Sequence, residues 1–271
     1  MNTAYALLAL PAAALYAFRW TWWKKDLPGL PALCYHKIGT PPRGSRLKEL
    51  WVSPEKFAKQ LDWLNKKGYR TLLFSELLQI REGKEKFTGK ELLITFDDGY
   101  ENNYLQAWPV LREKGAKANI FVVYNTVGKT NVWHNPGTEP WINMAGRDML
   151  LEMQESGCVE YGSHTMNHPK LEKIPAEDAK WEIEESKLQL EKLFKRKLCA
   201  FAYPYGIGAY NEKIRKFVLD AGYTFDFSFK QGKTPWPWDR EARTIDRLFI
   251  KKNDSLLDLA LHIKKGFARL W

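Results

Sequence analysis

Two adjacent carboxylates follow an apolar run near the middle of the chain. Asp97 and Asp98 come directly after residues 92–96 (Leu-Leu-Ile-Thr-Phe) and precede Gly99. This run predicts a buried strand, so the two acids should lie at the rim of a sheet. Because consecutive side chains of an extended chain point in opposite directions, one carboxylate could bind a metal while the other transfers protons. Asp-Gly is also a common turn dipeptide, so this motif alone leaves a plain turn open.

Two histidines form the second chemical signal. His164 and His168 follow residues 159–163, which also have the pattern of a strand. Imidazoles four residues apart can face one ion if the chain between them makes one helical turn, and a carboxylate completes a three-ligand site with an open position. Such a pair is usually structural when it stands alone. Here it ends a strand as Asp98 does, which favours a metal site.

A third signal is the run 203–206 (Tyr-Pro-Tyr-Gly), which ends another predicted strand. A turn of this kind can form the wall of a pocket, with Tyr203 and Pro204 near a substrate. It can also direct a backbone N–H inward, where acyl transfer needs a donor for the oxyanion. An ordinary turn at the end of a strand is the alternative.

Strand and helix patterns alternate from residue 33 to residue 265. This alternation predicts one domain with parallel strands and covering helices, and at this length it favours an α/β barrel over an open doubly wound sheet. The predicted strands are 33–36, 69–74, 92–96, 118–124, 159–163, 198–203, 223–229 and 245–250, and the predicted helices are 54–67, 75–81, 101–114, 147–155, 176–194, 211–221 and 255–265.

Composition limits the classes of partner. The 271 residues carry 42 Lys and Arg against 32 Asp and Glu, a net charge of +10, which suits an anionic lipid surface or simply a solvated basic face. Zinc-finger spacing, RNA-binding signatures and phosphate-binding glycine loops are absent from the sequence, so we expect no nucleic-acid partner. Cys34, Cys158 and Cys199 are too widely spaced for a zinc knuckle or redox pair, and we expect small buried residues.

The chain begins with an apolar stretch, residues 5–23, with Trp22, Trp23, Lys24 and Lys25 at its far end. Its length and its terminal Trp and Lys residues predict a membrane anchor, although a signal peptide is an alternative. We therefore divide the chain into an N-terminal membrane anchor or signal-like segment, 1–25, and a single domain, 26–271, which carries the candidate catalytic motifs. The positive residues that follow the stretch favour a cytoplasmic domain, but so few charges leave the side of the membrane open.

Taken in order, the motifs at 95–100, 163–168 and 203–206 resemble those of the NodB-type polysaccharide deacetylases, carbohydrate esterase family four. The resemblance extends from about residue 30 to residue 266. The segments 35–36 (Tyr-His) and 51–54 (Trp-Val-Ser-Pro) resemble the branch that contains the poly-N-acetylglucosamine deacetylases.

The resemblance implies a distorted barrel of about seven strands and a divalent metal, usually zinc, held by Asp98, His164 and His168. Asp97 would be the general base, and the backbone N–H of Tyr205 would help to stabilise the oxyanion. The implied reaction removes N-acetyl groups from an N-acetylglucosamine glycan, either a polysaccharide or a lipid-linked saccharide, and releases acetate.

The chain departs from the family pattern at two places. Many members have an arginine where this chain has Ala202, and Arg247 could reach the base from a later strand instead. Many members also have a late histidine as general acid, but His262 lies in a pattern typical of a helix. His36, which could also bind substrate or simply hydrogen-bond at the barrel rim, Asp97 itself after protonation, or a water are the other candidate proton donors.

Loop tryptophans could stack on sugar rings. The candidates are Trp133, Trp141, Trp236 and Trp238. Two other functions stay open: a glycan-binding or assembly protein without catalysis, and a C–N hydrolase of a small amide. The presence of both aspartates and both histidines disfavours the first, because a protein that only binds glycan has no chemical need for all four.

Overall fold

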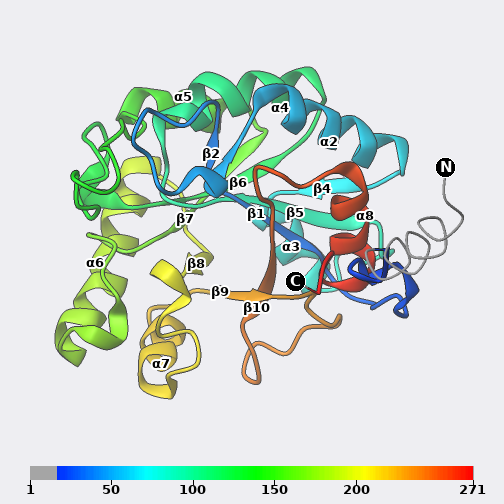
Figure 1. Cartoon of the computed structure of the whole chain (residues 1–271). Helices are drawn as coiled ribbons and strands as arrows, with labels where there is room; N and C mark the ends of the chain where they lie inside the picture. The colour runs from blue at the N-terminus through cyan, green and yellow to red at the C-terminus, as the bar shows by residue number, and fades with distance from the viewer. Residues whose placement is uncertain (1–16, 271) are drawn as a thin grey trace, which may run out of the picture.

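Seven parallel strands close into a barrel in the computed structural model, which describes residues 17–270 (Figure 1). The strand order is β1-β10-β9-β8-β7-β6-β5, and β5 pairs with β1 to close the ring. This closure confirms the predicted barrel of about seven strands and excludes the open doubly wound sheet. The strands are β1 (Ala32–Tyr35), β5 (Glu91–Phe96), β6 (Ala118–Val122), β7 (Val159–Ser163), β8 (Ala200–Ala202), β9 (Phe225–Gln231) and β10 (Ile245–Phe249).

An eighth strand, β4 (Arg70–Leu72), lies outside the ring on β5. It pairs with residues 91–93, and β6 takes over the same edge of β5 at residues 95–96. Asn119 of β6 satisfies the backbone where β4 ends: its Nδ2 donates to Leu72 O (2.9 Å) and its Oδ1 accepts from Phe74 N (2.9 Å). A short parallel pair, β2 (Lys37–Ile38) with β3 (Trp51–Val52), follows β1.

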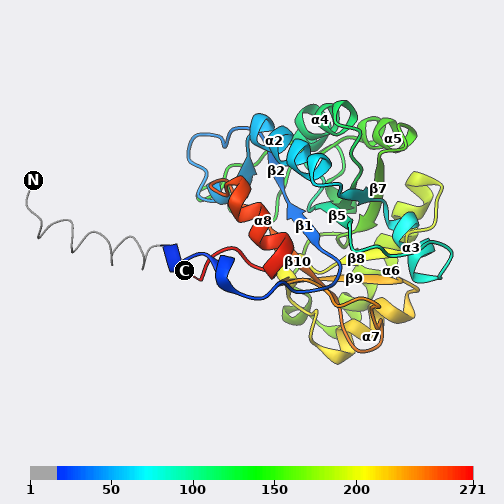
Figure 2. The same ribbon diagram turned by 90° about the vertical axis from the view of Figure 1, so that its right-hand side faces the viewer.

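Helices surround the strands in both ribbon views (Figures 1 and 2). Ser53 caps the N-terminus of α2 by accepting from Lys56 N, and Phe57, Leu61 and Leu64 lie on its buried face. The helices are α2 (Pro54–Lys66), α3 (Phe74–Arg81), α4 (Trp108–Glu113), α5 (Arg147–Glu155), α6 (Ala176–Phe194), α7 (Glu212–Asp220) and α8 (Leu256–Lys265).

The helix predicted at 101–114 is present over residues 101–113, but it is not α-helical throughout. A π-helical segment, η3 (Asn103–Ala107), precedes α4. Pro109 explains the change in hydrogen bonding, because it lacks the N–H that a regular α-helix would donate to Leu105.

The alternation of side chains along each strand produces two apolar clusters. Alternate residues such as Leu33 and Ile94 pack outward against the helices. Residues such as Ala32, Leu93 and Phe227 point into the barrel, where α3 contributes Phe74 to the same cluster. Cys34 is buried, Cys158 and Cys199 are half-buried, and all three are free thiols. The prediction of small buried residues is therefore correct for Cys34 alone.

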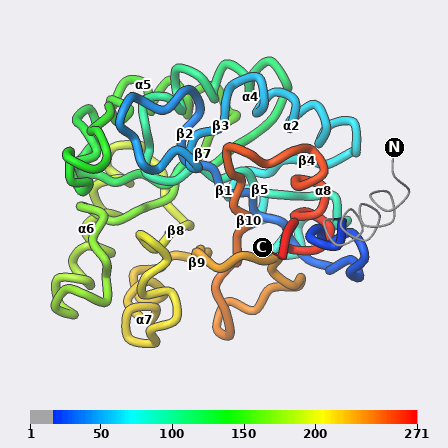
Figure 3. Tube along the Cα trace, in the orientation of Figure 1, coloured from blue at the N-terminus to red at the C-terminus, as the bar shows by residue number. Residues whose placement is uncertain are grey.

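The two ends of the described chain lie side by side (Figure 3). We call residues 19–27 the N-terminal strap. Its backbone is hydrogen-bonded to the C-terminal residues: Thr21 N donates to Ala268 O (2.9 Å), and Leu270 N donates to Arg19 O (2.9 Å). Within residues 17–270, no helix has both the length and the apolar character needed to cross a membrane. Most of the predicted anchor, 1–16, lies outside the described residues.

Asp258 of α8 joins the strap to the domain. It accepts hydrogen bonds from Trp20 Nε1 (3.0 Å), from Arg269 Nε (2.7 Å) and from both donors of Ser255. Burial alone would raise the pKa of Asp258, but the hydrogen bonds from Arg269 and Ser255 outweigh it and hold that pKa below its usual value.

We therefore expect Asp258→Asn to lower the free energy of unfolding by about 2 kcal/mol at pH 7, because charged hydrogen bonds in a buried site are lost. The folded-state pKa is depressed, so the loss should be complete above about pH 4 and should shrink as the pH falls further. Urea unfolding at several pH values measures this. The control is Asp178→Asn, an exposed acid in the first turn of α6, which should cost at most about 0.5 kcal/mol. Equal losses in the two variants would contradict the role of Asp258.

Candidate active site

Asp97 and Asp98 stand at the carboxyl end of β5, as the sequence predicted. Asp97 N donates to Tyr35 O (3.0 Å), which continues the pairing of β5 with β1. The chain then turns sharply, because Asp98 and Gly99 both have positive φ (77° and 84°). The two carboxylates consequently enter different surroundings.

Asp98 meets the two predicted histidines. Its Oδ1 is 3.5 Å from His164 Nε2 and 3.3 Å from His168 Nε2. The three side chains are buried, and their potential ligand atoms lie within 4.8 Å of one another. Two imidazole nitrogens and one carboxylate oxygen form the three-ligand set that leaves a catalytic zinc ion an open position.

The protonation of His164 tests whether a cation fits this set. Its Nδ1 lies 2.7 Å from Ala202 O, a contact that requires the proton on Nδ1. Burial lowers the pKa of His164 to about 4, so the ring is neutral at neutral pH and its Nε2 lone pair faces the carboxylate of Asp98. Two acceptors at 3.5 Å repel each other unless a cation lies between them. The residues therefore fit a divalent metal ion.

The segment between the histidines is not the helical turn that the spacing predicted. Thr165 and His168 have positive φ (73° and 61°), and His168 N donates to Thr165 Oγ1 (2.9 Å). Glu182 of α6 holds this turn by accepting from Met166 N (2.8 Å) and Asn167 N (2.9 Å). The sequence did not identify Glu182, because an acid on an amphipathic helix has the pattern of a solvated face.

Backbone strain is concentrated at this site. Among residues 17–270, five non-glycine residues have positive φ. Four of them are Asp98, Thr165, His168 and Tyr205, and the fifth, Lys195, is the C-cap of α6. A non-glycine residue in this conformation costs free energy and persists where surrounding contacts impose it. The fold therefore holds these functional side chains in fixed positions.

Asp97 faces an arginine inside the barrel. Arg247 Nη1 lies 2.5 Å from Asp97 Oδ1, and Nη2 lies 2.8 Å from Oδ2, so the pair is bidentate. Arg247 is fully buried, and its Nε donates to Ser228 O (2.9 Å). Burial alone would raise the pKa of Asp97, but Arg247 and His164 outweigh burial and hold it below its usual value. The predicted contact between Arg247 and Asp97 is confirmed.

A cavity of about 270 Å³ opens onto both carboxylates. It is lined by His36, Leu47, Leu50, Asp97, Asp98, Trp133, His134, His164, His168, Tyr205 and Phe229. His36 Nε2 is 3.9 Å from Asp97 Oδ2, so this predicted residue joins the site. Tyr203 and Pro204 do not line the cavity. The buried Tyr203 hydroxyl donates to Asp226 (3.0 Å), and Pro204 is buried.

The tryptophan candidates separate into two groups. Trp133 lies in the cavity wall and stacks on His168 (ring centroids 4.5 Å apart), whereas Trp141 is exposed and its Nε1 donates to His134 O (2.7 Å). Trp236 and Trp238 pack against the cluster inside the barrel, and Trp238 contacts Phe225 at the start of β9. Sugar stacking by these last two is therefore a wrong expectation, because their rings fill the opposite end of the barrel.

His262 lies within α8, as its helical pattern predicted. Its Nδ1 is 2.9 Å from Gln231 Nε2, and its Nε2 is 3.7 Å from Asp254 Oδ2. It is not among the residues that line the cavity with Asp97, which removes the geometric basis for a general acid here.

A buried ion pair that the sequence did not identify holds one wall of the cavity. The fully buried Lys37 places its Nζ 3.8 Å from Glu139 Oε1 and 4.7 Å from the ring centroid of Tyr100. Glu139 also accepts from Ser45 Oγ (2.8 Å) and Leu47 N (3.0 Å), which fixes the segment that brings Leu47 to the cavity. These partners are about a hundred residues apart, so no local pattern could have revealed them.

The sequence of this chain is similar to those of known polysaccharide deacetylases. The family model described as polysaccharide deacetylase matches residues 84–225, more than half of the chain. The chain is 31% identical over 212 residues to YxkH of Bacillus subtilis, a protein named after this family, with 78% of this chain and 68% of YxkH covered. It is 28% identical over 215 residues to the poly-β-1,6-N-acetyl-D-glucosamine N-deacetylase of Staphylococcus epidermidis, with 76% and 70% covered.

The fold of this chain is also similar to that of a solved structure. The crystal structure of a polysaccharide deacetylase from Bacillus cereus superimposes with a TM-score of 0.74 at 27% identity, covering 87% of this chain and 69% of that one. The closed barrel, the acids and histidines at its rim and these similarities together show that the chain belongs to the polysaccharide deacetylase family.

Proposed function

We propose that this protein is a metal-dependent N-deacetylase of a glycan that contains N-acetylglucosamine, with zinc as its metal. One observation carries the proposal: Asp97, fixed by Arg247, opens into the same cavity as the Asp98, His164 and His168 set. The Staphylococcus epidermidis relative is named for removal of N-acetyl groups from poly-β-1,6-N-acetylglucosamine, which supports the same class of substrate for this chain.

Asp98, His164 and His168 would hold the metal ion, which when bound supplies Lewis-acid polarisation of the acetamide carbonyl and of the attacking water. Asp97 is ionised at neutral pH because of Arg247, and it therefore accepts the water proton. The bidentate contact also fixes the direction of its oxygens. Tyr205 lines the cavity and has a positive φ, and in the proposed mechanism its backbone N–H would donate to the oxyanion.

The proton then has to reach the leaving amine. Asp97 can return the proton that it accepted as the C–N bond breaks, which gives acetate and a free amine. Burial lowers the pKa of His36, so this ring is neutral at neutral pH and acts by hydrogen bonding near Asp97 Oδ2. Asp97 is therefore both the base and the proton donor in the proposed cycle.

Attachment to a membrane through the N-terminal segment is part of the proposal. Phe18, Trp22 and Trp23 are about half exposed (48%, 53% and 47%), and Lys24 and Lys25 follow them directly. Exposed aromatic rings beside lysines suit the interface between lipid and water. These residues continue the apolar stretch of the sequence, so the strap would lie at the membrane surface.

The metal site makes the first prediction. The full chain in detergent should bind zinc in a one-to-one ratio, and His168→Ala should weaken zinc binding by at least about a hundredfold, because one of three ligands is lost. Isothermal titration and metal analysis measure this. Asp97→Asn is the control and should keep wild-type affinity. Loss of zinc from Asp97→Asn but not from His168→Ala would refute the assigned ligands.

Catalysis makes the second prediction. The zinc-loaded full chain should release acetate from β-1,6-linked N-acetylglucosamine oligomers, and Asp97→Asn should lower kcat by about 10² to 10⁴ without loss of zinc. Arg247→Lys should lower kcat by at least about tenfold, since one ammonium cannot replace the bidentate contact. Acetate from N-methylacetamide but not from oligomers would favour the small-amide hydrolase. Zinc-loaded protein that binds oligomers without releasing acetate would favour a glycan-binding protein.

Membrane attachment makes the third prediction. The full chain should float with liposomes that contain anionic phospholipid and should resist extraction with alkaline carbonate. A form that lacks residues 1–16 should float weakly, and Trp22→Ser with Trp23→Ser should remove its remaining binding. Truncation after residue 16 rather than residue 25 keeps the strap that packs on α8. If the full chain and the form that lacks residues 1–16 resisted carbonate extraction equally, residues 1–16 would not be the membrane anchor.

A further inference from the structure

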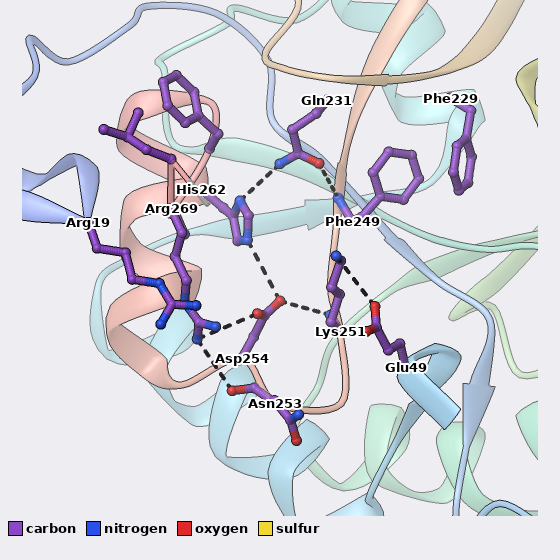
Figure 4. A pocket seen from close by; sticks show the side chains of 13 residues that line it. Arg19, Glu49, Phe229, Gln231, Phe249, Lys251, Asn253, Asp254, His262 and Arg269 are labelled. Carbon is purple, nitrogen blue, oxygen red and sulfur yellow. Dashed lines mark hydrogen bonds and ion pairs between the residues drawn. The ribbon is translucent and has the colours of Figure 1, made fainter. Parts of the chain in front are cut away.

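A second and larger cavity has a volume of about 620 Å³, and Figure 4 shows the side chains that line it. Phe229 lines both cavities. The segment η2 (Lys48–Leu50) also borders both, because Leu50 lines the catalytic cavity and Glu49 lines the larger one. The two spaces are therefore neighbours at the same rim of the barrel, on either side of Phe229.

Two aromatic rings form the wall nearest to the catalytic cavity. Phe229 of β9 and Phe249 of β10 have ring centroids 3.8 Å apart, and Phe229 is 40% exposed. Phe249 is half-buried beside it, and an exposed apolar patch with a polar rim is a frequent feature of ligand-binding sites. The faces of aromatic rings suit the apolar face of a pyranose, which presents C–H groups rather than hydroxyls.

The polar lining suits a ligand with many hydroxyls and little charge. Arg19, Lys251 and Arg269 are offset by Glu49 and Asp254 in the same lining. Lys251 Nζ lies 3.4 Å from Glu49 Oε2, and the guanidinium of Arg269 is bonded to Asp258. Since Lys251 and Arg269 already have carboxylate partners, a phosphate would have to displace those carboxylates. A neutral ligand can hydrogen-bond to the same donors and acceptors without separating the pairs.

The polar groups at the back of this cavity are held in place by one another. In Figure 4, Gln231 lies between His262 and the backbone of Phe249, with its Nε2 2.9 Å from His262 Nδ1 and its Oε1 accepting from Phe249 N (3.1 Å). Asp254 Oδ2 is 3.7 Å from His262 Nε2 and accepts from Lys251 N (2.8 Å). A fixed polar surface beside exposed aromatic rings is typical of a preformed binding site.

We propose that this cavity binds a second sugar residue of the glycan whose N-acetyl group lies in the catalytic cavity. This inference rests on the proposed function and specifies its substrate: an oligosaccharide or polymer that crosses Phe229, rather than a single sugar. The glycan would run from the metal site across Phe249 toward residues 267–270, which form the outer wall of the cavity.

Binding without turnover tests the proposal. In the zinc-loaded Asp97→Asn full chain, Kd is measured for β-1,6-linked N-acetylglucosamine oligomers of one to six residues, by calorimetry and by ligand-observed NMR for weak binders. Affinity should rise from the monosaccharide to the oligomers. Added Phe249→Leu should weaken oligomer binding by about tenfold, the usual effect of losing one aromatic contact, and leave monosaccharide binding unchanged.

Two further variants make this result specific. Glu49→Gln, at an exposed position where folding is not at risk, should weaken oligomer binding while leaving the monosaccharide unaffected. Trp181→Leu removes an exposed aromatic ring on α6 that lines neither cavity, and it should change nothing.

Equal affinity for the monosaccharide and all oligomers would overturn the proposal, as would equal weakening of every ligand by Phe249→Leu and Glu49→Gln. The result is separate from catalysis. If the wild-type protein released no acetate but kept length-dependent binding that Phe249→Leu reduced, the deacetylase assignment would fail and the second sugar site would stand.

Discussion

The buried pair of Asp97 and Arg247 is the constraint on which this site depends. Two charges inside a barrel lined by apolar residues lose their hydration, and a bidentate contact is the geometry that best offsets this loss. The contact spans β5 and β10, which are not neighbours but are both paired with β1. Barrel closure through β1 therefore brings the arginine to the acid, and an open sheet would leave each charge without its partner.

This pair also determines how the neighbouring acid can be used. Asp97 stays ionised and fixed by Arg247, while the left-handed turn at Asp98 directs the next carboxylate to the two histidines. In the proposed mechanism, the same few residues thus separate proton transfer from metal binding. The barrel fixes the orientation of the His164 ring, because the Nδ1 of this ring donates to the carbonyl of Ala202 on β8. Although Ala202 replaces the arginine of many family members, its backbone still orients a ligand.

The predictable parts of the molecule are those with local patterns. The periodicity of apolar residues identified α2, α5, α6 and β7, and the residue types at strand ends identified Asp97, Asp98, His164 and His168. Long-range contacts were not predictable: Glu182 holds the histidine turn, and Glu139 with Lys37 holds the opposite wall. Tyr203 is a residue that the sequence assigned to the site wrongly. Its motif predicted a pocket residue, but its hydroxyl donates a hydrogen bond to the buried Asp226. Arg247 was predictable because Ala202 stands where many family members have an arginine, so another cation had to contact Asp97.

A glycine links the catalytic cavity to its larger neighbour. Gly206 has a φ of 70°, and a Cβ at this position would overlap the Cβ of Phe229. The absence of a side chain therefore lets Phe229 approach the turn that carries Tyr205, and this approach places one ring in the walls of both cavities. The motif at 203–206 acts less through direct contact by Tyr203 and Pro204 than through the space left by its glycine. That space brings the aromatic wall formed by Phe229 and Phe249 next to the catalytic residues, where a glycan chain could contact both.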